Sequence, residues 1–535
     1  MLYRTLSVLL LSSCWGPFAA TLGAGTSTNS ASPPAPQQPA ATVPQSQADA
    51  TNPANLPFSR TRWIVMFRGR SFDLSTYRAA MRDRADVQVV SQIVGQLELA
   101  ALDDQAQFAD FARGFGAEVL SQWWLINGCA VHATPDIVAT LRKHPRVAYV
   151  IPDRLNRAQM ARKRMIPFQG EAVDEWNHNA VEAHRQGFTA VGPIRPEGAP
   201  APSIAVLDSQ LEWFDPTQSP NRSNSPIYND ASGSTRIVDS VRAANIGAST
   251  TLQAFRNNFQ NSIYNSTTNF PSQHGNGITH AAAARAPQPN DPVPAPGTGQ
   301  APNASIVSID IIEDWTQIQA NFGCTVTNSA RYSSTIAITD ACQFLASNAA
   351  LYNTLSAVCA FGGCGNPWSP EQQAMDSLVL NADIVMCVPS GNYFEDGASL
   401  LGAWPTSGET DNVNFLAGRN ATAWDSMYGA NSIVVGAAHH GSKIVPTWSG
   451  AGPLTPTRSS QSSSPMSAQY GSTYCAGFVP DNYFAVPNIT HDFSRSYPDI
   501  VAIGAGITIQ ERFWNGNSVQ EVQRSVDGSS VSCAQ

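Results

Sequence analysis

The chain has few charged residues and few of the patterns that mark metal-binding, nucleic-acid-binding or membrane-spanning proteins. Only 13% of its 535 residues are charged, and the net charge of −9 comes without a basic stripe. Nucleic-acid binding therefore has little support. The nine cysteines form no C-x-x-C pair, and no histidine lies at zinc-finger spacing, which argues against a structural zinc site. Beyond the N-terminus, no stretch is apolar for long enough to cross a bilayer.

Apolar residues and loop-forming residues are abundant instead. Hydrophobic residues make up 42% of the chain, and it contains 38 glycines and 37 prolines. A chain of this length can form two or three domains with a large core. Low charge together with many loop residues fits an exported protein better than a cytosolic one.

The N-terminus has the pattern of an export signal. Arg4 precedes a short apolar run over 6–11, which is too short to span a membrane. The run leads into L-S-S-C at 11–14, which resembles a bacterial lipoprotein box with Cys14 as the lipidated residue. The alternative is an ordinary signal peptide cut near Ala20 or Ala24. We interpret residues 1–24 as a signal peptide, and both readings predict a secreted or extracytoplasmic protein, lipid-anchored at a bacterial membrane in the first case.

Two segments follow with different compositions. Residues 25–58 are rich in Ala, Pro, Ser, Thr and Gln and are predicted to be a disordered linker. Residues 59–155 are predicted to form a small α/β domain. Its expected elements are a strand over 62–67, two helix-like stretches with some strand character between them over 73–115, a hairpin turning at Asn127-Gly128, a helix from a Thr134 cap through Leu141, and a strand over 146–153.

A basic and polar stretch, 154–165, separates this domain from the rest of the chain. We assign 156–165 to a linker that is open to proteolytic processing. Residues 166–535 alternate strand-like and helix-like segments, which predicts an α/β fold with a parallel sheet and crossover helices. The expected strands are 203–208, 304–310, 356–361, 384–389 and 432–437, and the expected helices are 176–187, 274–285, 337–348 and 368–380. Two stretches rich in Asn, Ser and Thr, 216–273 and 453–475, are expected to be surface insertions.

Four short motifs place reactive side chains at the ends of predicted elements. Asp208 ends the strand I-A-V-L-D, His274 begins an Ala-rich helix, Asn392 follows a strand in P-S-G-N, and Ser530 lies in D-G-S-S-V-S-C-A at a predicted helix N-terminus. Taken singly, each has an ordinary explanation: a turn-capping Asp, a surface His, a Gly-Asn turn and a Ser-rich flexible tail. Their order, Asp before His before Ser, differs from the orders in chymotrypsin-type and α/β-hydrolase enzymes.

These motifs resemble those of the subtilisin-like serine proteases, and the resemblance covers about residues 59–535. Supporting matches are A-F-G-G (360–363), N-S-I-V-V-G-A (431–437), T-W-S-G-A-G (447–452) and Y-P-D-I-V-A-I-G (497–504). The resemblance implies that Ser530 is the nucleophile, His274 the general base and Asp208 the residue that orients His274. It implies that Asn392 and the Ser530 N–H stabilise an oxyanion. It also implies that Ala360, Phe361 and Gly362 bind extended substrate by strand addition.

The chain departs from the family pattern at several positions beside these residues. Gln210 replaces a Gly, Asn276 and Gly277 replace Thr and His, and Ser529, Ser532 and Ala534 replace Thr, Ala and Pro. His280 is a weaker base candidate because it lies inside the predicted helix. Two disulfides suggested by proximity alone are Cys324–Cys342 and Cys359–Cys364. The resemblance implies no required cofactor, but it allows structural calcium, for which candidate ligands are Asp310, Asp314, Asp396 and Asp411.

The resemblance further implies that 59–155 is a ferredoxin-like propeptide that assists folding and inhibits the enzyme. The leading hypothesis is a secreted or lipid-anchored serine endopeptidase, made as a zymogen, with protein or peptide substrates and its own propeptide as partners. The family has a long helix after the nucleophile, whereas five residues follow Ser530 here, so 166–535 is expected to be a C-terminally truncated catalytic domain. The alternatives are a non-catalytic or truncated subtilase-fold protein that acts as a binding module, and a carbohydrate- or peptide-binding surface module.

Overall fold

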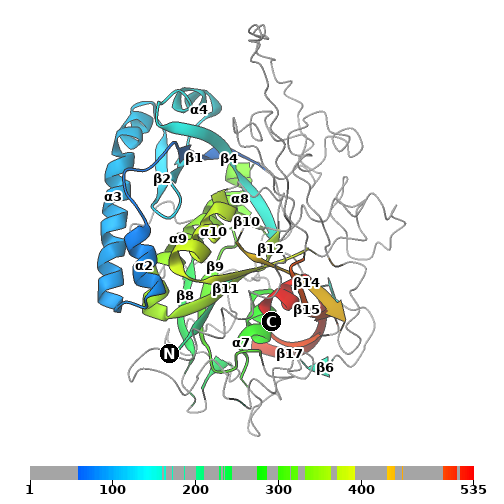
Figure 1. Cartoon of the computed structure of the whole chain (residues 1–535). Helices are drawn as coiled ribbons and strands as arrows, with labels where there is room; N and C mark the ends of the chain where they lie inside the picture. The colour runs from blue at the N-terminus through cyan, green and yellow to red at the C-terminus, as the bar shows by residue number, and fades with distance from the viewer. Residues whose placement is uncertain are drawn as a thin grey trace, which may run out of the picture. The chain divides into compact units, whose positions relative to one another are not determined.

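The computed structural model describes a set of segments within the compact unit Asp49–Gln535 (Figure 1). They are residues 58–158, 162–163, 171–172, 186, 201–209, 228–230, 233, 235–243, 274–285, 299–313, 315–322, 332–362, 370–391, 431–439, 449, 498–505, 507–514 and 519–535. The predicted signal peptide 1–24, nearly all of the linker 25–58 and of the helix 176–187, and the insertion 453–475 lie outside the described residues. Among the helices within them, none combines the length and the apolar character needed to cross a membrane.

Residues 58–158, called the N-terminal segment below, form an antiparallel sheet with helices. Its elements in chain order are β1 (Phe58–Phe67), α2 (Ser75–Arg82), α3 (Val87–Gly114), β2 (Glu118–Trp123), β3 (Gly128–His132), α4 (Pro135–Leu141) and β4 (Val147–Ala158). β1 lies between β3 and β4, antiparallel to both. Alternate side chains of β1 enter two different core clusters, so both faces of the strand are buried.

The helical region 73–115 contains two helices and no strand between them. The side chain of Asp86 accepts a hydrogen bond from the Gln88 N–H and so caps α3. Only the four residues 83–86 separate α3 from the end of α2, which leaves no room for the expected strand. At α4, Thr134 occupies the N-cap position and Pro135 the first helical position as predicted, although the Thr134 hydroxyl makes no capping bond.

The hairpin of β2 and β3 forms as predicted, with its turn shifted by two residues. Trp123 pairs with Gly128, so the loop is 124–127 and Gly128 opens β3. A Cβ atom on Gly128 would lie 2.8 Å from the Val65 carbonyl oxygen and 2.7 Å from the Met66 sulfur. Glycine is therefore required here by close packing against β1 rather than by the turn.

The second segment, which is the described part of the chain from residue 201 onward, is built on a seven-stranded sheet. Every strand pairing in this sheet is parallel. The order is β15-β14-β13-β11-β7-β9-β8, which places β7 near the middle. The strands are β7 (Ser203–Asp208), β8 (Ile237–Arg242), β9 (Ser305–Asp310), β11 (Thr354–Cys359), β13 (Val385–Pro389), β14 (Ile433–His439) and β15 (Ile500–Ala505). The predicted parallel α/β architecture is confirmed.

One strand lies where the sequence suggested only a surface insertion. β8 is inside 216–273 and pairs with β9 at the edge of the sheet. Its residues I-V-D-S-V-R bury Val241 and Asp239 while Val238 stays exposed, which is the half-buried pattern of an edge strand. The polar residues around it mask this short alternation in the sequence.

Helices cover both faces of the parallel sheet. Leu207, Ala357, Met386 and Val434 share a core cluster with α9 (Thr335–Tyr352) and α10 (Pro370–Ala382). The alternate residues of the same strands, such as Val206, Val358 and Val435, cluster with α7 (His274–Ala283) and α13 (Ser529–Ala534). This is the two-sided burial expected for a parallel sheet.

Smaller elements complete the described part of the chain. α8 (Trp315–Phe322) follows β9. β16 (Ile507–Trp514) and β17 (Val519–Asp527) form an antiparallel hairpin that pairs with β6 (Glu171–Ala172) and β5 (Arg162–Lys163). Cys342 and Cys359 are buried free thiols, so the two disulfides guessed from proximity are wrong.

β4 joins the two segments. It continues to Ala158, three residues into the stretch 156–165 that is predicted to be a linker. Its last residues pair with β10 (Tyr332–Ser334) on one edge and with β12 (Phe361–Gly362) on the other (Figure 1). The strand is extended here because it gains backbone partners on both sides, which no local pattern in the basic sequence indicates.

A buried carboxyl group on α9 contacts the N-terminal segment and is expected to make the stability of the protein depend on pH. Asp340 accepts hydrogen bonds from Trp123 Nε1 at 2.6 Å and Ser121 Oγ at 3.2 Å. Burial raises the pKa of Asp340 to about 7, with Asp153 adding to the shift and Arg62 opposing it. The folded protein therefore holds a proton that the unfolded chain releases near pH 4. Its contribution to stability is fully present below about pH 4 and is lost as the pH rises to about 7.

Replacing this carboxyl by an amide tests that linkage. We expect Asp340→Asn to be more stable than the unaltered protein at pH 8, with the difference shrinking as the pH falls towards 4. Urea unfolding at a series of pH values measures it. Parallel stability curves for the two proteins would show that Asp340 does not titrate in this range.

Candidate active site

Asp208 ends the central strand β7 and is fully buried. The N–H of Ser209 donates to its Oδ1 at 2.6 Å. The carboxyl end of a strand in a parallel sheet is where α/β proteins build their sites. The apolar run before Asp208 forms β7 and so brings the carboxylate to this edge.

His274 begins α7, and its ring lies against the Asp208 carboxylate. Nδ1 is 2.9 Å from Oδ1 and 2.8 Å from Oδ2, and the His274 side chain is 3% exposed. A proton on Nδ1 would be donated to the carboxylate, which leaves Nε2 as a hydrogen-bond acceptor.

Ser530 is the second residue of α13, and its Oγ lies 3.1 Å from His274 Nε2. The structure thus brings together three side chains that are 66 and 256 positions apart in the chain. α13 sits close to β15, since a Cβ atom on Gly504 would lie 2.6 Å from the Gly528 carbonyl oxygen. The Gly528 N–H donates to the Gly504 carbonyl at 2.6 Å. These backbone contacts fix the start of the helix that carries Ser530.

The start of α7 is fixed by a second close approach. The Gly275 N–H donates to Ser209 Oγ at 2.8 Å. A Cβ atom on Gly275 would lie 2.0 Å from the Ser209 carbonyl oxygen, so no side chain fits without moving the backbone. Ser209 and Gly275 follow Asp208 and His274 directly, and their contact therefore holds the Asp–His pair in place.

Gly275→Ala is expected to push the first turn of α7 away from β7. We predict a loss of about 1–3 kcal/mol in stability and a longer distance between His274 and Asp208. Gly95→Ala on α3 is the matched control, because a Cβ atom there meets nothing within 4 Å; it should be neutral or stabilise by about 0.4–1 kcal/mol. Thermal unfolding of both variants measures the difference, and equal melting temperatures would contradict the argument.

The remaining predicted catalytic positions have different outcomes. Asn392 lies outside the described residues, which end in this region at Gly391, just after β13; its role as an oxyanion donor stays a prediction. His280 is fully buried within α7, and burial lowers its pKa to about 4, so its ring is neutral at physiological pH. The proposed base is therefore His274, whose ring lies against the Asp208 carboxylate and the Ser530 hydroxyl.

The predicted substrate-binding edge is paired with the chain's own N-terminal segment. Ala360 precedes β12, in which Phe361 pairs with Ala158 and Gly362 with Arg157, antiparallel. These two partners of β12 belong to β4, and on the opposite edge of β4 the strand β10 pairs with Leu155, Asn156 and Arg157. Residues 155–158 thus form the middle strand between β10 and β12. β10 was missed from the sequence, because its three residues, Y-S-S, carry no strand signal.

The arrangement of Asp208, His274 and Ser530 can move a proton. The Ser530 hydroxyl can pass its proton to His274 Nε2, and the buried Asp208 carboxylate can stabilise the resulting imidazolium. The described residues contain no group of three or more metal-ligating side chains. Of the four calcium candidates only Asp310 is described, and its Oδ1 accepts the Ile312 N–H at 3.0 Å.

Comparison with known proteins finds a family match for one part of the chain. Residues 113–159 match the peptidase inhibitor I9 family. No curated protein matches the chain. Among solved structures, the chain is similar to fervidolysin from Fervidobacterium pennivorans, described as a keratinolytic enzyme related to subtilisin, with 12% identity and a TM-score of 0.45 over 89% of this chain and 53% of that one. The chain therefore spans about half the length of fervidolysin.

Two further solved structures are proteases. The epidermin leader peptide processing serine protease from Staphylococcus aureus has 10% identity and a TM-score of 0.42 over 89% of this chain and 87% of that one. The CspB protease from Clostridium perfringens has 12% identity and a TM-score of 0.38 over 68% and 86% of the two chains. With an I9 segment in its antiparallel sheet and a helix-covered parallel sheet after it, the chain resembles the subtilisin-like serine proteases with their I9-type propeptide.

Proposed function

We propose that this protein is a serine endopeptidase of the subtilisin type that hydrolyses peptide bonds through an acyl-enzyme. The observation that carries the proposal is the contact series from Asp208 through His274 to Ser530, with 2.8 Å and 3.1 Å between the interacting atoms. The I9 segment supports it at the level of the family.

In the proposed reaction, Ser530 Oγ attacks the substrate carbonyl carbon while His274 Nε2 takes the hydroxyl proton. Asp208 stabilises the imidazolium that forms. The tetrahedral intermediate collapses as His274 gives the proton to the leaving amine, which departs and leaves an ester on Ser530. Water, deprotonated by His274, then attacks the ester carbon, and His274 returns the proton to the Ser530 oxygen as the ester bond breaks, which releases the carboxylic acid product and restores the enzyme. The Ser530 N–H, at the start of α13, and the Asn392 amide are the proposed oxyanion donors.

We further propose that the protein is made as a zymogen. Residues 155–158 occupy the position between β10 and β12 in which an extended substrate would lie. The N-terminal segment then inhibits the enzyme until the chain is cut within the basic stretch that ends at residue 165. Export by the signal at 1–24, a lipid anchor on Cys14 and structural calcium belong to the same proposal and rest on the sequence.

A fluorophosphonate probe tests the nucleophile directly. The probe should label Ser530 in protein that has lost its N-terminal segment, and mass spectrometry of the labelled peptide identifies the residue. Ser530→Ala should remove the label. If Ser530 stays unlabelled in folded protein that has lost its N-terminal segment, the result would contradict the protease proposal and favour a binding protein with this fold.

A further inference from the structure

An ion pair between Arg154 and Glu371 is buried where the N-terminal segment meets α10. The two side chains are 4% and 0% exposed. Arg154 lies on β4, four residues before Ala158, and Glu371 is the second residue of α10. An isolated charge is costly to bury, so the Glu371 carboxylate is stabilised by a positive partner in this position.

Within the part of the chain that the structure describes, Glu371 keeps one carboxylate oxygen without a hydrogen bond beside Arg154. It lies in the first turn of α10, where the helix dipole favours a negative charge. Its Oε1 accepts from Arg154, whereas its Oε2 is buried and has no hydrogen-bond partner among the described residues. A guanidinium is planar and can donate to both oxygens of a carboxylate, so the free oxygen suits a better-placed arginine.

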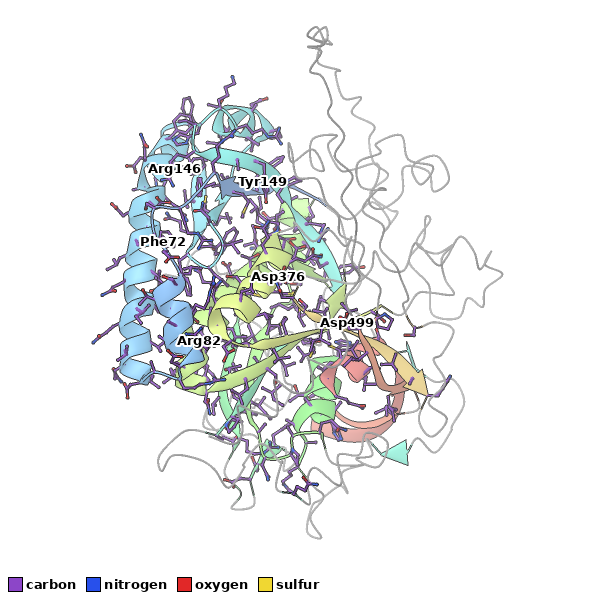
Figure 2. The ribbon with its side chains drawn as sticks, in the orientation of Figure 1. Phe72, Arg82, Arg146, Tyr149, Asp376 and Asp499 are labelled. Atoms are coloured by element: carbon purple, nitrogen blue, oxygen red, sulfur yellow. The ribbon has the colours of Figure 1, made fainter. Side chains whose placement is uncertain are left out.

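The strand that carries Arg154 runs directly into the residues held as a substrate would be. Leu155 to Ala158 pair with β10 and β12, and in an extended strand four residues span about 13 Å. β4 and α10 also meet away from the ion pair, where Gln373 donates to the Tyr149 hydroxyl at 3.1 Å; Figure 2 shows Tyr149 on β4 and, on α10, Asp376. β4 is therefore held at Ala158 by its pairing with β12 and at Arg154 by the ion pair with Glu371. The extended chain between these two residues sets the distance from β12 to Glu371.

We infer that Glu371 is a substrate subsite for an arginine side chain, four residues before the residue that pairs with Phe361. The inference rests on the proposed function. Arg154 fills this subsite in the zymogen, and a peptide substrate bound in the same register places its own arginine there. The preferred substrates are then proteins with an arginine four residues before the residue that pairs with Phe361. The residues next to the cleaved bond do not determine the preference alone.

Synthetic peptides of residues 150–165 test the subsite in the self-processed enzyme. Four peptides carry arginine, lysine, citrulline or glutamine at position 154 and compete in one reaction, with kcat/KM read by mass spectrometry. Citrulline keeps the size and planarity of arginine without its charge. We expect arginine to exceed citrulline and glutamine at least about tenfold, since a hydrogen bond to a charged group contributes that much, with lysine between them. Equal rates for all four peptides would overturn the inference.

Two variants assign the preference to Glu371. In Glu371→Gln, the kcat/KM of the arginine peptide divided by that of the citrulline peptide should fall to near one. Asp383→Asn is the matched control, because Asp383 directly follows α10 and likewise pairs with an arginine of the N-terminal segment, Arg84, but is half exposed. It should keep the full ratio. A preference that persists in Glu371→Gln would show that arginine is recognised elsewhere. If Glu371→Gln does not fold, the peptide series in the unaltered enzyme decides.

The two proposals fail in different ways. Cleavage of the peptides by Ser530→Ala protein would contradict the proposed function, because the reaction would not use this nucleophile. Cleavage that depends on Ser530 but is indifferent to position 154 would contradict the subsite alone.

Discussion

Ser530→Ala and His274→Ala are each expected to lower kcat by about six orders of magnitude, and the double variant by little more. The reason is that the nucleophile and the base act in one proton transfer across the 3.1 Å between Ser530 Oγ and His274 Nε2. Removing either group stops the same step. Asp208→Asn should cost about four orders of magnitude, since it leaves the geometry but favours the wrong histidine tautomer. Hydrolysis of a peptide substrate by self-processed protein, or by variants freed of their N-terminal segment with an added protease, measures these losses.

Ser532→Ala is the control for this series. It removes a hydroxyl from the same short helix, two residues from Ser530, where the only described bond of that hydroxyl is to the Gly528 carbonyl at 3.4 Å. We expect activity within a few-fold of the unaltered protein. Equal losses in Ser530→Ala and Ser532→Ala would indicate that the helix is merely disturbed. Additive losses from Ser530 and His274 would contradict a shared step.

Arg62→Met is expected to lower stability much more than the loss of a half-exposed charge where the two segments meet. Arg62 Nη2 lies 2.6 Å from Asp153 and 2.9 Å from Glu313, and all three side chains are buried. Burial alone would lower the pKa of Arg62, but the charges of Glu313 and Asp153 outweigh it and raise that pKa above its ordinary value. Removing one partner of a buried ion pair costs about 3–5 kcal/mol, because uncompensated charge stays behind. The midpoint of urea unfolding, in Ser530→Ala protein to prevent self-digestion, measures the loss.

Two further variants separate the buried charges from general packing. Arg84→Met removes an arginine whose pair with Asp383 is half exposed, and it should cost less than about 1 kcal/mol. Adding Glu313→Gln to Arg62→Met should restore part of the lost stability, because one of the two facing carboxylates is then neutral. A similar loss for Arg62→Met and Arg84→Met would contradict a special role for the buried cluster.

The parallel sheet could be predicted because most of its strands are recognisable from their own residues. β7, β9, β11, β13 and β14 are short apolar runs between turn residues, and each lies within two or three residues of its predicted place. The edge strand β8 and the three-residue β10 could not be found in this way. Their pairing depends on a neighbouring strand, and their own residues are too few or too polar to show a period.

The candidate site was predictable for a related reason. Asp208, His274 and Ser530 stand at the ends of a strand and two helices, where the sequence shows both the element and the reactive side chain. The contacts that hold them were not predictable. The bond from Gly275 to Ser209 and the approach of Gly528 to Gly504 join backbone atoms from distant parts of the chain.

The sequence by itself determined which residues are available for chemistry and where most strands and helices begin, because those properties depend on neighbours within a few residues. Only the tertiary structure decided that β4 continues to Ala158 between β10 and β12, and that Arg62 and Arg154 are buried against Glu313 and Glu371. These partners are more than 200 positions apart in the chain. Their pairing is set by how the two segments pack, so the beginning of a basic stretch that looks solvated in the sequence becomes a strand between β10 and β12.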